Sequence, residues 1–246
     1  MKILLAPAET KNKGGNGTPF CKANFKYEAL FDSKEHILSI YENYVNSLDE
    51  EALSDWFGLK NKNEVQKYAS SVRQKPTMKA IERYNGVAFD ALNYAQLPQN
   101  AQSYIDSNVV IFSNLFGVLS ASDLIPDYKY KQGAKLPKIT VEKYYNEQIS
   151  PFLEEYLGDE IIDLRAGFYE KFYKTTKANI LMFKFIKEGK VVSHWAKHYR
   201  GKVLQHIALH DIQSLAEFMA LEIEGLKLIE IQEKKNTKLL ILDIVE

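Results

Sequence analysis

The sequence contains a single cysteine, Cys21, among its 246 residues. One thiol cannot close a disulfide within the chain, and it excludes the cysteine-rich zinc sites of small metal-binding domains. The chain also lacks any apolar run near the roughly 18 residues that a membrane-spanning helix needs, and its N-terminal apolar segment is too short for a signal peptide. These absences predict a cytoplasmic protein with no membrane partner.

The chain also lacks net charge, because 32 Lys and Arg residues balance 32 Asp and Glu residues. The balance is uneven along the sequence. Residues 165–202 hold ten basic and two acidic residues, whereas residues 203–246 hold eight acidic and four basic ones. Residues 128–138 add four lysines and no acid. Neutrality therefore does not exclude a polyanionic partner, since phosphate binding depends on local charge.

Apolar patterning predicts the fold class. Hydrophobic residues make up 46% of the chain and charged residues 26%, as in ordinary globular proteins. No repeat or low-complexity linker is present, so we expect one domain over residues 1–246. Apolar runs and apolar spacing predict strands at 2–6, 109–112, 161–164, 180–186 and 191–195, a C-terminal hairpin of 226–231 and 239–245, and helices within 33–107 and at 141–157 and 197–212. This mixture predicts a single compact α+β domain with a mixed β-sheet and several helices.

A few residues mark expected helix boundaries. Ser33 and Asp49 are expected N-caps, because their side-chain oxygens can accept hydrogen bonds from the free amides of a helix start. Pro76 is expected as the first residue of a helix, where its missing N–H costs nothing. His210 is expected on the apolar side of the last long helix, and His194 in the strand before it.

The histidines form two i, i+4 pairs, His194 with His198 and His206 with His210, a spacing that can place two imidazoles on one metal ion. Neither pair belongs to an HExxH motif, so we expect no metal site and no cofactor. No GxSxG motif is present, and Cys21 lies in an expected loop without a nearby histidine. The glycine-rich run at 13–18 (KGGNGT) matches neither phosphate-binding glycine motif, and we expect a flexible surface loop there.

The strongest anion-binding candidate is the run at 193–202 (SHWAKHYRGK), which lies at an expected strand-to-helix junction. The guanidinium fork of Arg200 suits a phosphate, and Lys197 and Lys202 add charge. Gly201 permits close approach of the backbone, and a helix N-terminus favours an anion. The alternative interpretation is a basic surface turn with packed aromatic residues.

The order and spacing of four segments resemble the peroxide stress protein YaaA family along nearly the whole chain. The segments are ILLAPAET, IFSNLFGVLSASDLIPDYKYKQG, IDLRAGFYEKF and SHWAKHYRGK. The central one resembles the family's Ser-Gly-Leu-Tyr-Gly-Val-Leu-Arg-Pro-x-Asp run, with Tyr-Arg and Gly following. It keeps Ser113, Leu115, Gly117, Val118, Leu119, Asp123, Tyr128 and Gly133, with Phe116 for the Tyr and Lys129 for the Arg. The family's Tyr-Ala-Lys-x-x-Arg-Gly run is matched at Ala196, Lys197, Arg200 and Gly201, with Trp195 for the Tyr.

This sequence also departs from the family pattern and resembles a divergent member. Glu9 stands where the family's Ser-Pro-Ala-Lys-Thr start has its lysine. Ser120 and Ala121 replace the Arg-Pro pair. The family's Asn-Leu-x-Ser-x-x-Tyr run is matched only at Leu164 and Tyr169, with Asp163 for the Asn and Ala166 for the Ser.

The resemblance implies a cytoplasmic role in oxidative stress, lowered free intracellular iron, and binding of double-stranded DNA through a basic cleft and a helix-hairpin-helix-like element. It indicates no obligate protein partner. Residues expected to contact DNA or phosphate are Lys129, Lys131, Lys197, Arg200, Gly201 and Lys202. Candidate pocket residues are Pro7, Thr10, Lys11, Gly86, Asn114, Phe116, Gly117, Asp123, Tyr128, Asp163 and Tyr169.

Two other functions stay open beside DNA binding. One is an enzyme acting on a nucleobase or nucleotide phosphate, with Lys197 and Arg200 on the phosphate and Asp123 or Asp163 in proton transfer. That function predicts a deep pocket around these residues. The other is iron sequestration, for which metal analysis before and after replacement of His194 and His198 is the test.

Overall fold

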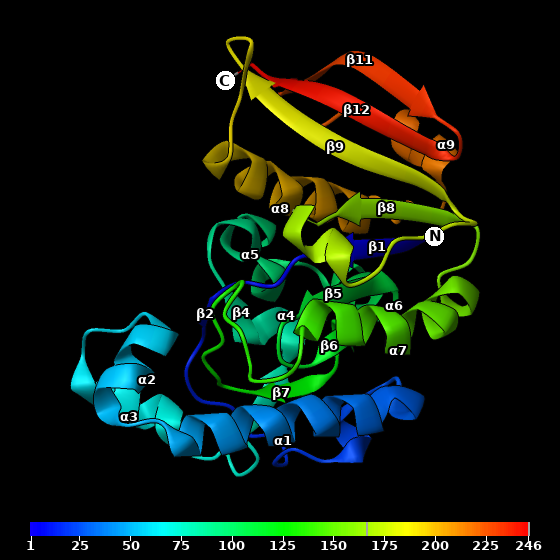
Figure 1. Cartoon of the computed structure of the whole chain (residues 1–246). Helices are drawn as coiled ribbons and strands as arrows, with labels where there is room; N and C mark the ends of the chain where they lie inside the picture. Colours follow the sequence, from blue (N-terminus) through cyan, green and yellow to red (C-terminus); the bar gives the residue numbers. More distant parts are fainter. Residues whose placement is uncertain (166, 246) are drawn as a thin grey trace.

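A mixed sheet with strand order β11-β12-β9-β8-β1-β5-β6 forms the centre of the fold, and β10 pairs with β9 (Figure 1). The computed structural model describes residues 1–165 and 167–245, so Ala166, one of the departures from the family pattern, lies outside the described residues. The parallel strands are β1 (Lys2–Leu5), β5 (Val109–Ser113), β8 (Glu160–Leu164), β9 (Asn179–Lys187) and β12 (Thr237–Ile244). The antiparallel strands are β6 (Gly117–Ser120), β10 (Lys190–Val191) and β11 (Leu226–Lys234).

Strands β1, β5 and β8 form the buried middle of the sheet. Their aliphatic runs KILL, VVIFS and EIIDL are nearly continuous rather than alternating. Such runs are typical of parallel strands, which are covered on both faces. The expected strands at 2–6, 109–112, 161–164 and 180–186 and the C-terminal hairpin are confirmed, as is the α+β class.

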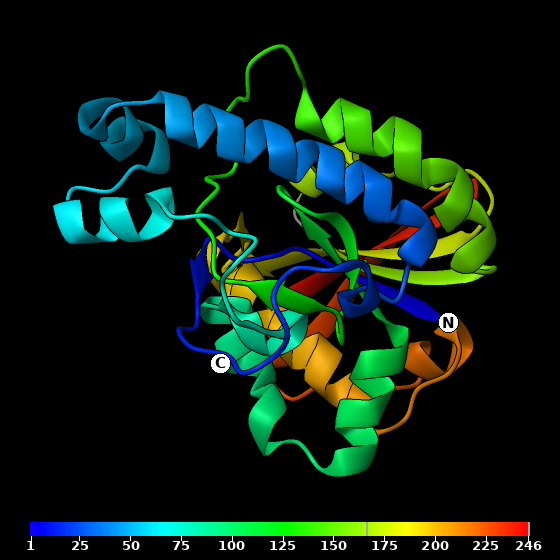
Figure 2. The same cartoon turned by 90° about the horizontal axis from the view of Figure 1, so that it is seen from below.

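Helices cover both faces of this sheet (Figure 2). On one face lie α1 (Phe31–Ser47) and α7 (Val141–Tyr156). On the other lie α5 (Val87–Leu92), α6 (Gln99–Asn108), α8 (His194–Leu209) and α9 (Leu215–Met219). The apolar side chains of both helix layers join those of the sheet in one buried cluster.

Shorter elements fill the N-terminal half. The helices there are α2 (Glu50–Phe57), α3 (Lys62–Ala69) and α4 (Ala80–Arg83), with 3-10 turns η1 (Lys22–Asn24), η2 (Glu28–Leu30) and η3 (Tyr94–Gln96), and η4 (Gly167–Lys171) follows β8. Two small strand pairs are β2 (Thr10–Lys11) with β4 (Tyr84–Asn85), and β3 (Thr77–Lys79) with β7 (Leu124–Pro126). The β2–β4 pair matters for function, because it ties the segment after β1 to the start of α5.

The structure confirms one of the expected helix boundaries and corrects two. Asp49 is an N-cap, accepting from the Ala52 amide at 2.9 Å. Ser33 is not, because α1 begins at Phe31 and the Ser33 hydroxyl donates to the Leu30 carbonyl. Pro76 precedes strand β3 rather than starting a helix.

The expected strand at 191–195 stops early. Strand β10 ends at Val191, and His194 is already the first residue of α8. The Tyr199 ring stacks on Phe185 of β9 with centroids 6.1 Å apart, so packing on the sheet favours the helix over the β-branched propensity of this run. His210 is exposed at the end of α8 rather than on its apolar side.

Lys34 of α1 is buried beneath the β5–β6 hairpin. Its ammonium donates hydrogen bonds to the carbonyl oxygens of Phe116 and Val118, and it lies 5.4 Å from the centroid of the Phe25 ring. Burial lowers the pKa of Lys34 to about 8, an effect that the nearby carboxylate of Asp123 opposes.

This lysine predicts a pH dependence of stability. Between pH 8 and about 10.5 the unfolded chain binds one proton more than the folded chain at this site, so the free energy of unfolding should rise with pH, by up to about 1.4 kcal/mol per unit. Lys34→Met should remove that increment, as measured by urea denaturation at several pH values. The exposed Lys60→Met is the control. Equal slopes in Lys34→Met and the unmodified protein would contradict the prediction.

Candidate functional site

A cavity of about 350 Å³ lies at the carboxyl ends of β1 and β8. It is lined by residues 5–10, which end β1 and follow it, by residues 85–89 of β4 and α5, and by Gln132, Leu164, Tyr169, Lys197 and Arg200. Open sheets with parallel strands commonly bind ligands at this edge. The volume suits a small molecule or one nucleotide unit of a larger one.

Lys197 and Arg200 bring positive charge to the cavity from α8. They are three residues apart, so they share one face of the helix. The Nε atom of Arg200 is buried and makes no hydrogen bond within the described residues, and burial lowers the pKa of its guanidinium. Neither residue forms an ion pair with a described carboxylate. Lys197 is exposed and Arg200 is partly buried. This arrangement favours an anionic ligand, because a partly buried guanidinium without an ion-pair partner is stabilised by one.

A chain of buried hydroxyl groups lies beside the segment after β1. The Tyr128 hydroxyl is 2.8 Å from both the Tyr84 hydroxyl and the Ser113 hydroxyl. Burial raises the pKa of Tyr84 to about 12 and that of Tyr128 well above its usual value, so both stay protonated at neutral pH. The Ser113 hydroxyl also accepts from the amides of Leu115 and Phe116, which fixes the turn of the β5–β6 hairpin.

Lys11 lies against these tyrosines. Its ammonium nitrogen is 3.9 Å from the centroid of the Tyr128 ring and 5.4 Å from that of Tyr84. Within the described part of the chain its hydrogen bonds are long, at 3.4 and 3.3 Å, to the carbonyl oxygens of Ala8 and Glu9. Burial lowers the pKa of Lys11 to about 7, so a substantial share of this amine is uncharged at neutral pH.

The two candidate carboxylates have structural partners. Asp163 forms a buried ion pair with Arg165, whose Nη2 is 2.7 Å from Oδ2 and whose Nε is 2.9 Å from Oδ1. Asp123 accepts from the amides of Lys26 and Ser120, and burial raises its pKa to about 6. Neither side chain lines the cavity, so the expected proton transfer from Asp123 or Asp163 has no support in this geometry.

Gly201 does not face a phosphate. It is buried in α8, where a Cβ atom would lie 2.0 Å from the carbonyl oxygen of Ala88 in α5. This glycine therefore lets α8 approach α5 closely, rather than letting a phosphate approach the backbone of α8. The expected contact between Gly201 and a phosphate is corrected accordingly.

The structure brings together only part of the expected site. Residues that line the cavity are Pro7, Thr10, Gly86, Tyr169, Lys197 and Arg200. Residues that do not line it, in β2, in the β5–β6 hairpin, in the segment after β7 or further along α8, are Lys11, Asn114, Phe116, Gly117, Tyr128, Lys129, Lys131 and Lys202. Lys202 donates to Gln205 at 3.2 Å, and the Lys129 carbonyl accepts from the Tyr41 hydroxyl.

Sequence reasoning missed Asn85 and Gln132, which also line the cavity. Asn85 is placed by its β-pairing with Thr10. Gln132 is placed by Glu9, whose Oε1 accepts from the Gln132 amide at 3.2 Å. The only signal for Gln132 is its position in the central segment that resembles the family. Glu9 departs from the family pattern, and its hydrogen bond thus holds Gln132 at the cavity.

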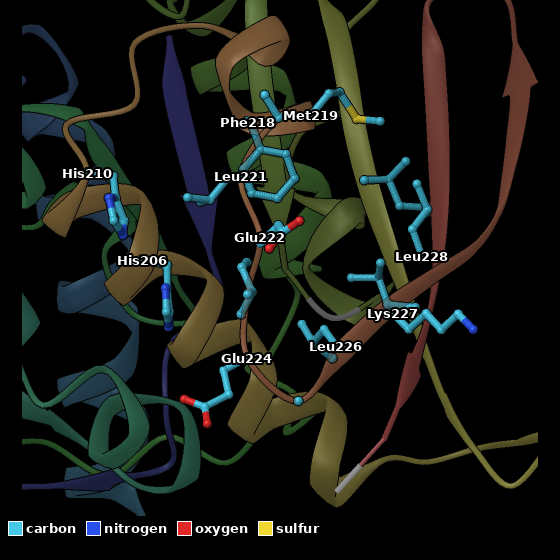
Figure 3. Close-up of a pocket in the computed structure, with 15 residues that line it drawn as sticks. His206, His210, Phe218, Met219, Leu221, Glu222, Glu224, Leu226, Lys227 and Leu228 are labelled. Atoms are coloured by element: carbon cyan, nitrogen blue, oxygen red, sulfur yellow. The ribbon is translucent and has the colours of Figure 1, made fainter.

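A larger and more open cavity of about 790 Å³ lies between the end of α8, α9 and the C-terminal hairpin (Figure 3). His206 and His210 stack there with ring centroids 6.1 Å apart, and burial lowers the pKa of His206. Within residues 1–165 and 167–245, no three His, Cys, Asp or Glu side chains form a group that could hold a metal ion. The cavity is lined mainly by apolar side chains such as Phe218 and Leu226. It holds none of the residues of the four segments that resemble the family, so we place the candidate site at the first cavity.

Comparisons with known proteins support the resemblance of the four sequence segments to one family. The model of a family described as peroxide stress protein YaaA matches residues 1–232. An uncharacterised protein of Campylobacter jejuni is 42% identical over 247 residues, covering 100% of both chains. A UPF0246 protein of Corynebacterium glutamicum is 32% identical over 241 residues, covering 91% of this chain and 95% of its own. No helix in the described part of the chain is long and apolar enough to cross a membrane. The matched segments meet around the cavity, and the match extends over nearly the whole sequence: this chain belongs to the peroxide stress protein YaaA family.

Proposed function

We propose that this protein serves the peroxide stress response in the cytoplasm by binding double-stranded DNA through phosphate contacts. Family membership supports the role in peroxide stress. The proposal of DNA binding rests on one observation, the free positive charge that Lys197 and Arg200 present to the cavity from one face of α8. Phosphate contacts of this kind carry affinity but little sequence information, so the binding should not depend on sequence.

A second basic segment extends this charge toward a helix pair. Helices α2 and α3, with eight residues each, are joined by a turn at 58–61 and form the helix-hairpin-helix-like element of our proposal (Figure 1). The Lys131 ammonium approaches this turn, lying 3.7 Å from the Cβ position of Gly58. Gln132, the next residue, lines the cavity. Residues 129–132 therefore connect the α2–α3 turn to Lys197 and Arg200, which suits a DNA backbone lying across both.

Charge reversal of both cavity cations tests this function. Lys197→Glu with Arg200→Glu should lower duplex affinity by more than about tenfold, and should reduce the slope of log affinity against log salt by about 2, since two phosphate contacts are lost. A salt titration by fluorescence anisotropy measures both. Lys174→Glu with Lys177→Glu is the matched control, because it changes the same charge at exposed residues of the same basic window. Equal losses in the two double variants would mean that overall charge, not the cavity, governs binding.

The cavity itself favours a second candidate function, an enzyme acting on a nucleobase or nucleotide phosphate. Its volume of about 350 Å³ and the unpartnered buried Nε of Arg200 suit a small anionic ligand. Calorimetry with nucleoside monophosphates distinguishes this function. Saturable binding that Arg200→Met removes, without competition from duplex DNA, would favour the enzyme over the DNA-binding protein.

Our proposal includes the link to lower free iron that the family resemblance implies. Metal analysis of the purified protein separates direct from indirect effects. Stoichiometric iron that is lost on replacing His194 and His198, which lie one turn apart on α8, would indicate sequestration. Protein that stays free of metal after incubation with ferrous iron would indicate an indirect effect.

A further inference from the structure

We propose that two copies of this chain pair through strand β11, antiparallel and about a two-fold axis that passes through Gln232. The pairing joins the two central sheets into one continuous sheet. Strand β11 forms one end of the strand order, and none of its residues is among the described residues that line the candidate cavity. The inference is therefore independent of the proposed function.

The outer edge of β11 has no partner within the described part of the chain. Strand β11 ends the strand order and pairs only with β12 (Figure 1). Residues 227–234 are all exposed, so no described helix or loop covers this edge. The main-chain N–H and C=O groups that point away from β12 are open to a further strand, which is how strands are added to a sheet.

Apolar side chains are concentrated on this edge strand. Leu228, Ile229 and Ile231 are 44%, 52% and 38% exposed. Natural proteins protect exposed edges with prolines, charges or bulges. Strand β11 has a bulge between Leu228 and Glu230, which leaves 230–234 as a regular stretch without proline. Only the charges of this stretch could prevent a second copy from pairing with it.

The pairing with β12 shows which side chains share a face of β11. Ile231 lies opposite Leu240, which lines the larger cavity beside α8 and α9. Side chains alternate between the two faces along a strand, so Glu233 also lies on the α8 side. The other face carries Glu230, Gln232 and Lys234.

The charges of β11 select one register. A two-fold axis perpendicular to the sheet preserves its faces, so one residue of β11 lies opposite its own copy. With Gln232 on the axis, Glu230 of each copy lies opposite Lys234 of the other, on the same face. Axes at Glu230, Glu233 or Lys234 would place like charges opposite each other, which destabilises a strand pair. An axis at Ile231 would place Glu230 opposite Gln232 and form no ion pair.

The groups that this register uses are available to a partner. Neither Glu230 nor Lys234 forms an ion pair with a described residue. Gln232 donates to the Glu230 carboxylate at 2.8 Å, which holds that carboxylate on the face of the expected ion pairs. On the α8 side the two Ile231 side chains are diagonal neighbours across the axis, so pairing removes part of their exposed area from water.

The size of the contact predicts a reversible dimer. Pairing over residues 230–234 buries less surface than a permanent dimer needs, so the dimer should form in proportion to protein concentration. Strands β12 and β9 separate β11 from β8, at whose carboxyl end the candidate cavity lies. Dimer formation therefore leaves both cavities open.

Charge reversal tests the contact. Sedimentation velocity of the full chain over about a hundredfold range of concentration measures the dissociation constant. Glu230→Lys and Lys234→Glu should each raise it more than about tenfold, because each places like charges opposite each other. The two substitutions together should restore the dimer, since opposite charges then face each other again. Glu188→Lys with Lys190→Glu, at exposed residues of the β9–β10 hairpin, is the control and should change nothing.

Disulfide formation tests the register. In a chain that carries Cys21→Ser, Gln232→Cys should form a covalent dimer under mild oxidation, because residues directly opposite each other in paired strands lie within reach of a disulfide. Glu233→Cys should not, because its own copy then lies two residues along the partner strand, beyond that reach.

Hydrogen exchange of the unmodified protein needs no variant, and amides within 230–234 should exchange more slowly as the concentration rises. A protein that stays monomeric overturns the inference. So does a dimer that both single charge reversals leave intact, that the double reversal fails to restore, or that links through Glu233→Cys rather than Gln232→Cys. In each of these cases duplex affinity that depends on Lys197 and Arg200 leaves the proposed DNA binding intact. Loss of that dependence in a protein that still dimerises would overturn the proposed function alone.

Discussion

Replacing Asp163 with alanine should lower the free energy of unfolding by about 3–5 kcal/mol, because it leaves the guanidinium of Arg165 buried without its carboxylate. Both side chains are almost completely buried. Arg165 also donates to the carbonyl oxygens of Tyr169 and Tyr173, so it cannot turn out to solvent without losing these hydrogen bonds. Urea denaturation followed by circular dichroism measures the change.

Three further variants define what the ion pair contributes. Asp159→Ala removes an exposed carboxylate just before β8, the strand that holds Asp163, and should change stability by less than about 0.5 kcal/mol. Asp163→Asn restores the residue of the family pattern and should still destabilise the fold. Adding Arg165→Met to Asp163→Asn should recover part of the loss, since no charge is then left buried. A double variant less stable than Asp163→Asn alone would show that the charges do not act as a pair.

Gly117→Ala should destabilise the protein by about 2–4 kcal/mol, for two reasons that add. Gly117 has a φ of +63°, a left-handed conformation that costs an alanine about 1 kcal/mol. A Cβ atom there would also lie 2.5 Å from the Tyr145 ring, and overpacking of this kind costs about 1–3 kcal/mol. The midpoint of urea denaturation measures the sum.

Gly133→Ala separates the two reasons. Gly133 also has a positive φ, +79°, but a Cβ atom at this position meets nothing within 4 Å. Its replacement should therefore show the conformational cost alone. If Gly117→Ala is no more destabilising than Gly133→Ala, the Tyr145 ring moves aside at little cost and the steric argument is wrong.

The central strands could be predicted from sequence, because parallel strands buried on both faces need continuous apolar runs, as in KILL and VVIFS. The start of α8 could not. Residues 191–195 have a strand-like composition, and the stacking of Tyr199 on Phe185, 14 residues earlier, shows why the last two of them, His194 and Trp195, are helical. Propensity is local, whereas this choice depends on a tertiary contact.

The cations of the candidate site could be predicted as well, since Lys197 and Arg200 combine a basic run with the family pattern. Asn85 and Gln132 could not, because the β2–β4 pairing and the bond from Gln132 to Glu9 join segments far apart in the chain. Asp163 and Gly201 were interpreted as functional although they hold the fold together. Gly201 matches the family pattern and Asp163 replaces the Asn of that pattern, but a pattern does not separate packing from chemistry.

The contact between Gly201 and Ala88 has a consequence for binding. It joins α8, which provides the cations, to α5, whose first turn lines the same cavity. Two helices in main-chain contact move as one body. The distance between the two cations of α8 and the lining residues of α5 is therefore set before a ligand binds. A ligand then loses little free energy to ordering the protein when it binds. Affinity at this site thus depends in part on the absence of a side chain that no ligand would ever touch.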